Sequence, residues 1–123
     1  MTDAPALSSR GTLCEALGGP ESLFRIARGM HERMVADPVL GARFAHAAES
    51  HVPHLAMWLT EVTGGPPLYA AIHDDISPML RRHAGQAIPE PERARFVECA
   101  MSAVAAVAPN ADPEAVAALR RYF

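Results

Sequence analysis

The chain has 123 residues, half of them hydrophobic, and a formal net charge of −3 at pH 7. This length is typical of one domain with a single core. The acidic charge balance argues against a nucleic-acid-binding surface, and no run reaches the ~18 apolar residues of a membrane span.

Residues 1–10 are mostly small or polar, which predicts a flexible tail before one domain over 11–123. The tail lacks the positive and apolar regions of a signal peptide. Cys14 and Cys99 stand alone, without the CxxC spacing of a redox or zinc motif. These features predict a protein of the reducing cytoplasm.

Helical periodicity dominates the first part of the chain. Thr12 and Glu15 form a capping-box pattern that opens a short helix, and Gly18-Gly19 ends it. Pro20 then begins an amphipathic helix over 20–36. The predicted buried stripe of that helix consists of Leu23, Ile26, Ala27, Met30 and Met34.

Two breaks divide the middle of the chain. Asp37-Pro38 ends the long helix and starts a brief one through Phe44. A helix over about 51–63 follows, and Gly64-Gly65-Pro66-Pro67 breaks it. The inward face of this helix should include His51, Leu55, Trp58 and Val62. A stretch that we expect to be loosely structured then contains Leu68, Tyr69 and Ile72.

Three further helices are predicted in the last part of the chain. A short helix covers 78–84, and a second long helix covers 89–107. Asp112 caps a last short helix that runs to the C-terminus. The apolar side of the second long helix should contain Phe96, Cys99, Ala100 and Ala103. Because strand-like alternation is confined to a few residues, the sequence predicts an all-α domain.

His83 is the histidine with the most constrained local context. It closes the run Met79-Leu80-Arg81-Arg82-His83 at the end of the short helix, just before Gly85. This placement gives the imidazole a fixed direction and suits a metal ligand. An alternative is a cation that the helix macrodipole favours at a C-terminal end.

The other histidines are less distinctive. His51 and His54 share one helix face, but they lack the Glu and the i, i+4 spacing of a zinc-protease helix. His31 lies at the edge of an apolar stripe and can point inward or be partly exposed. His46 and His73 are predicted to be solvated in loops.

The order of these features resembles the truncated haemoglobins, most closely their second group, over about residues 11–108. Gly18-Gly19 and Gly64-Gly65-Pro66 are similar to the two glycine motifs of that family. The run that ends at His83 is similar to its proximal segment, and Phe44 to its haem-contacting aromatic residue. The resemblance implies a truncated globin fold, a two-over-two helical sandwich around haem b.

The resemblance also implies roles for individual residues. His83 would bind the haem iron, while His31 and His51 would lie on the distal side. His54 and Arg82 would face the haem propionates. The implied haem contacts are Phe44, His51, His54, Leu55, Trp58, Tyr69, Leu80, Arg82, His83 and Phe96.

Two positions depart from the family pattern. Phe96 stands where the second group characteristically has a tryptophan, and phenylalanine cannot donate a hydrogen bond. His31 stands where many members have a tyrosine. The hydrogen-bond network on the distal side should therefore differ from the usual one, with histidine donors in place of these groups.

The implied function is binding of dioxygen and other small ligands (NO, CO or peroxide), with NO-dioxygenase or peroxidase-like redox activity as a further implication. Catalysis would require an external reductase, and a monomer or homodimer is expected. One alternative is a haem-based sensor or interaction module without turnover. Another is a non-haem helical protein with a metal site of His31, His51 and His54.

Overall fold

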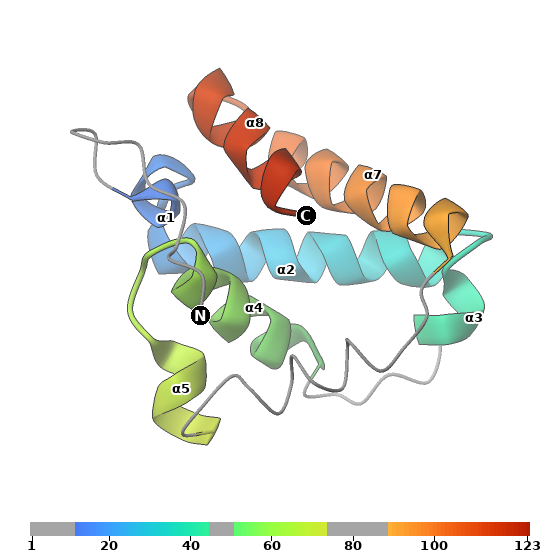
Figure 1. Cartoon of the computed structure of the whole chain (residues 1–123), viewed down its shortest axis with the longest axis horizontal. Helices are drawn as coiled ribbons and strands as arrows, with labels where there is room; N and C mark the ends of the chain where they lie inside the picture. The colour runs from blue at the N-terminus through green and yellow to red at the C-terminus, as the bar shows by residue number, and fades with distance from the viewer. Residues whose placement is uncertain (1–11, 45–50, 74–88) are drawn as a thin grey trace.

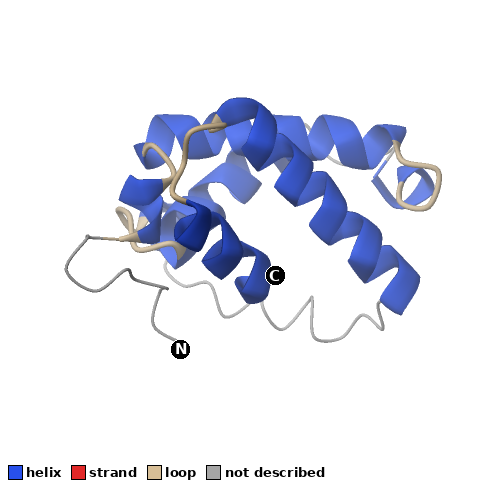
Figure 2. Ribbon diagram, turned by 90° about the horizontal axis from the view of Figure 1, so that it is seen from above, coloured by secondary structure: helices blue, strands red, loops and turns tan. Residues whose placement is uncertain are grey.

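The computed structural model describes residues 12–44, 51–73 and 89–123 (Figure 1). The regular elements in these ranges are helices, which confirms the all-α prediction (Figure 2). Their bounds are α1 Leu13–Ala16, α2 Gly19–Ala36, α3 Gly41–Phe44, α4 His51–Val62, α5 Leu68–His73, α7 Glu90–Val107 and α8 Pro113–Tyr122.

Some predictions fall outside the described residues. These are the flexible tail over 1–10, the short helix over 78–84 with Leu80, Arg82 and His83, and the loop position of His46. Apart from the start of α3, the ends of the predicted long helices agree with the structure or differ from it by one residue, for example Glu90 against 89. Such differences are ordinary at helix ends, where hydrogen bonding frays.

The first short helix begins as its capping pattern predicts. The Thr12 side chain accepts a hydrogen bond from the Glu15 N–H, and the Glu15 carboxylate accepts one from the Thr12 N–H. Gly18 and Gly19 follow with φ angles of 107° and 86°. Side chains other than glycine rarely adopt this left-handed conformation, so the pair allows the chain to turn at once into α2.

Helix α2 is the central element and packs against α4 on one side and α7 on the other (Figure 1). The predicted stripe from Leu23 to Met34 is buried as expected. The helices α2 and α7 approach closely at Gly29. A Cβ built there would lie 3.3 Å from the Ala103 Cβ, so a glycine suits this crossing.

The turn after α2 is held by Asp37, and its geometry corrects one prediction. The Asp37 carboxylate accepts hydrogen bonds from the N–H groups of Val39 and Leu40, at 2.8 and 3.0 Å. Residues 38–40 therefore form a turn, and the brief helix begins at Gly41 instead of at Pro38. Local hydrogen bonds from an aspartate side chain to nearby N–H groups compete with regular helix, and here they hold residues 38–40 in the turn.

The Asp37 carboxylate also joins distant parts of the chain. It accepts a hydrogen bond from the Arg95 Nε of α7 at 2.8 Å, and a further one from Nη2. The Arg95 guanidinium therefore lowers the pKa of the Asp37 carboxyl, and hydrogen bonds from the Leu40 and Val39 N–H groups lower it further. This contact fixes the end of α2 to the first turns of α7.

Helix α5 is a second correction, because the segment was expected to be loosely structured. Its six residues form a helix, so the backbone of His73 ends a helix and does not lie in a loop. The Glu61 carboxylate of α4 accepts a hydrogen bond from the Ala70 N–H at 2.9 Å. The carboxylate of another helix therefore pairs a free N–H group in the first turn of α5. Local sequence periodicity cannot reveal such a long-range cap.

Helices α7 and α8 complete the described core. The Asp112 side chain caps α8 by accepting a hydrogen bond from the Glu114 N–H at 3.0 Å, as predicted. Helix α8 contacts α1 and α7 (Figure 1). The ring of Phe123, which follows α8, packs edge-on against the Phe96 ring with centroids 5.4 Å apart. In the part of the chain that the structure describes, no helix is both long enough and apolar enough to cross a membrane.

Candidate functional site

His31 and His51 meet, although they come from different helices. Their Nδ1 atoms lie 2.8 Å apart, between α2 and α4, and the ring centroids are 4.8 Å apart. The Phe44 ring lies beside them, 5.6 Å from the His51 ring. The sequence predicted both histidines for one site, and the structure brings them into direct contact.

The short contact between the two Nδ1 atoms constrains their protons. A hydrogen bond between two imidazole nitrogens needs one nitrogen that carries a proton and one that does not. In the neutral pair, the ring that donates from Nδ1 therefore has Nε2 as an acceptor, and the other ring has Nε2–H as a donor. The pair thus presents one donor and one acceptor at its outer edges.

Phe44 is positioned by an ion pair next to it in the chain. The Arg43 Nε donates a hydrogen bond to the Glu92 carboxylate at 2.7 Å, which ties α3 to α7. This hydrogen bond lowers the pKa of the Glu92 carboxyl and raises that of the Arg43 guanidinium. Phe44 follows Arg43 directly, so the ion pair helps to hold its ring near His51.

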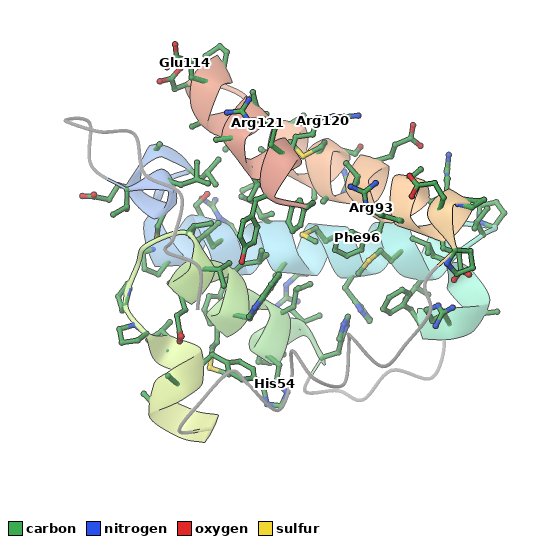
Figure 3. The ribbon with its side chains drawn as sticks, in the orientation of Figure 1. His54, Arg93, Phe96, Glu114, Arg120 and Arg121 are labelled. Atoms are coloured by element: carbon green, nitrogen blue, oxygen red, sulfur yellow. The ribbon has the colours of Figure 1, made fainter. Side chains whose placement is uncertain are left out.

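His54 lies apart from the pair and contacts α5. Its ring meets the Tyr69 ring edge-on, with centroids 6.1 Å apart. In Figure 3 its side chain leaves α4 on the side away from α7, the helix that carries Phe96. The two histidines on one helix face therefore have different neighbours, since His51 contacts His31 while His54 contacts Tyr69.

The face of α4 next to the histidine pair is only half-buried. Leu55 and Trp58 follow His51 by one and two helical turns and pack on the core without being fully covered. Phe96 of α7 is also partly buried against the core. The buried side of α4 consists of Ala56, Leu59, Thr60 and Val62. Of the four residues predicted to face inward, Val62 is therefore buried as expected, whereas His51, Leu55 and Trp58 are only half-buried.

Trp58 carries the one buried side-chain polar atom of the described residues that lacks a hydrogen-bond partner, its Nε1. The sequence placed Trp58 in the site, but it gave no sign that the N–H would be left unpaired. The Trp58 ring also lies near the Tyr122 ring of α8, with centroids 6.3 Å apart.

Two other candidate sites can be compared with this one. A surface groove of about 580 Å³ lies between α2 and α4, and its lining includes Phe24, Arg28 and Val52 but none of the predicted site residues. Among the described residues, no three His, Cys, Asp or Glu side chains are grouped closely enough to hold a metal ion. The structure therefore gives no support to a metal site of His31, His51 and His54.

A family model for the bacterial-like globins matches residues 12–121. The chain belongs to the bacterial-like globin family. No protein in the comparison with curated sequences is a match. The family assignment agrees with the resemblance to truncated haemoglobins that the glycine motifs indicated.

Solved structures of haemoglobins share the fold of this globin. A haemoglobin from Chloroflexus aurantiacus is 27% identical, with a TM-score of 0.77 and coverage of 91% of this chain and 90% of that chain. One from Thermobifida fusca is 28% identical, with a TM-score of 0.76 and coverage of 90% and 89%. The group II truncated haemoglobin from Bacillus anthracis, at 23% identity, shares the fold with a TM-score of 0.73 over 90% and 94%. The predicted truncated globin fold is thereby confirmed.

Haem is the cofactor that the globin family implies, and the described residues fit it. Phe44, Leu55 and Phe96 are half-buried apolar side chains, the kind of group that would contact a flat macrocycle. The Trp58 N–H and the histidine pair would add a few polar groups to this mainly apolar lining, which is the usual character of a cofactor pocket.

Proposed function

We propose that this globin binds haem b between His83 and the site formed by His31, His51, Leu55 and Trp58, and that it binds dioxygen, NO and CO there. The observation that carries this proposal is the contact of His31 with His51 beside Phe44, on a half-buried apolar face. Haem iron, when bound, supplies the ligand affinity and the redox chemistry.

The residues of the chain would set the selectivity. The proposed proximal ligand is the neutral His83 imidazole. Phe44, Leu55, Trp58, Tyr69, Leu80 and Phe96 would contact the macrocycle, and His54 and Arg82 would pair with its carboxylates. The histidine pair would hold an Nε2–H toward a ligand with partial negative charge. Such a bond is worth roughly 1.5–3 kcal/mol, which slows ligand release by about one to two decades.

The histidine pair also favours a second activity, peroxidase-like reduction of peroxide. Two electrons from an external reductase and two protons convert one hydrogen peroxide into two waters. The proton shared between the Nδ1 atoms makes His31 and His51 suitable for acid and base catalysis of O–O cleavage. NO dioxygenation would need the same external electron supply. A monomer or homodimer in the cytoplasm is part of this proposal.

Absorption spectra test the proposal directly. Protein reconstituted with haem should show a Soret band in the ferric, ferrous and ferrous-carbonyl forms, and His83→Ala should lose haem or change the ferrous spectrum. His73→Ala is the matched control, since this histidine has no role in the proposal. A colourless wild-type protein after reconstitution would refute the haem assignment, and an unaltered His83→Ala spectrum would refute the assignment of His83 as proximal ligand.

Ligand kinetics test the distal residues and the alternatives. His51→Ala and His31→Ala should each raise the dioxygen dissociation rate, and the argument fails if neither does. Peroxide turnover with a chemical reductant separates an enzyme from a haem-based sensor, which would bind ligands without turnover.

A further inference from the structure

The Trp58 indole has a donor that the protein itself does not use. The Nε1 atom is buried and has no hydrogen-bond partner, and an indole nitrogen can only donate. Buried polar groups in native proteins are nearly always paired, so an exception needs an explanation. A ligand that brings an acceptor atom into the site would pair this N–H.

The position of Trp58 agrees with that explanation. Residues 51, 55 and 58 follow the i, i+4, i+7 spacing of one helix face, so Trp58 shares its face of α4 with His51 and Leu55. The Tyr122 ring of α8 packs on Trp58 at 6.3 Å and helps to fix its orientation. The indole is therefore held on the α4 face that also carries His51, two helical turns further along.

We propose that the Trp58 Nε1–H donates a hydrogen bond to the small ligand in the haem site, which makes Trp58 a specificity-determining residue. This inference rests on the proposed function. Phe96, the aromatic residue of α7 in the site, cannot donate, whereas Trp58 supplies a donor from α4. The bond favours ligands with a charged or strongly polar acceptor, such as dioxygen or peroxide, over carbon monoxide.

The test uses two matched variants of the haem-loaded chain. Trp58→Phe removes the N–H and keeps a ring, while Trp58→His restores a ring N–H. The dioxygen dissociation rate should rise about tenfold in Trp58→Phe, the effect of one hydrogen bond to a charged group. It should rise less in Trp58→His, and carbon monoxide dissociation should change much less in both. Tyr122→Phe controls for ring packing.

A second readout is independent of kinetics. Trp58 is the only tryptophan of the chain, so the ¹⁵N-labelled protein has one indole N–H signal. This signal should differ between the dioxygen and carbon monoxide complexes, because only the former offers a strong acceptor.

Three results would overturn the inference while leaving the proposed function intact. These are an indole signal that is the same in both complexes, equal dioxygen release in Trp58→Phe and Trp58→His, or faster haem loss in Trp58→Phe with unchanged ligand release. The last result would assign the N–H to a haem carboxylate. Failure of the wild-type protein to form a Soret band would instead refute both proposals.

Discussion

Replacing Gly65 by alanine should destabilise the protein through a steric clash. A Cβ built at Gly65 would lie 2.7 Å from the Cys14 Sγ and 2.9 Å from both the Thr60 Cγ2 and the Thr60 carbonyl oxygen. Favourable carbon contacts need about 3.5–4.0 Å. The carbonyl cannot easily move away, because it accepts the Gly65 N–H at 2.9 Å.

The magnitude follows from what surrounds the new methyl group. Overpacking a well-packed interior costs about 1–3 kcal/mol. One of the three close atoms belongs to the backbone and a second to the buried Cys14, so we expect about 2–3 kcal/mol, in the upper part of that range. For a domain of this size, such a loss corresponds to a fall in Tm of roughly 10 °C.

Urea unfolding, followed by far-UV circular dichroism, measures the effect. The matched control is Gly19→Ala, where no atom lies within 4 Å of the built Cβ but φ is +86°. That variant should lose about 1–2 kcal/mol through backbone strain alone. Adding Cys14→Ala to Gly65→Ala should recover part of the loss, because it removes the Sγ atom. If Gly65→Ala is as stable as the wild type, or more stable than Gly19→Ala, the steric argument is wrong.

Three other predictions concern the described contacts. Asp37→Asn should lower the free energy of unfolding at neutral pH, because Arg95 depresses the pKa of the Asp37 carboxyl in the folded protein. The difference between the two proteins should persist above the unfolded pKa of about 3.9 and vanish as the pH falls through the lower folded pKa. Urea titrations at several pH values measure it. The Cys14 and Cys99 thiols, whose pKa values burial raises, should react with a disulfide reagent only on unfolding, and fast labelling of the native protein would contradict this. His31→Phe and His51→Phe should each cost the haem-free protein about 0.5–1.5 kcal/mol and the double variant little more, because both remove one hydrogen bond; additive losses in this cycle would exclude the pairing.

The helices were largely predictable because local signals define them. The capping box at Thr12, the stripe on α2 and the cap at Asp112 all depend on residues within a few positions of one another. Helix α5 was missed because its cap comes from Glu61 of another helix. The start of α3 was misplaced because Asp37 binds the next N–H groups through its side chain.

The sequence predicted residues of the candidate site, but it could not predict the contacts between them. Family resemblance named His31 and His51 together, yet only folding brings their Nδ1 atoms to 2.8 Å. The contact between Asp37 and Arg95 spans 58 positions of sequence, and no periodicity reveals such a pair. The unpaired N–H of Trp58 is likewise a property of its surroundings, so sequence alone could not identify it.

The close crossing of α2 and α7 at Gly29 has a consequence for the size of the site. Gly29 lies one half-turn before His31 on α2, and Ala103 lies two turns after Phe96 on α7. The two rings are therefore carried by helices whose spacing is set by one missing methyl group. Because a packed interior has low compressibility, a methyl group at position 29 would force Ala103 of α7 to move by a few tenths of an ångström. We therefore expect a substitution at Gly29 to change the separation of the two helices that carry His31 and Phe96.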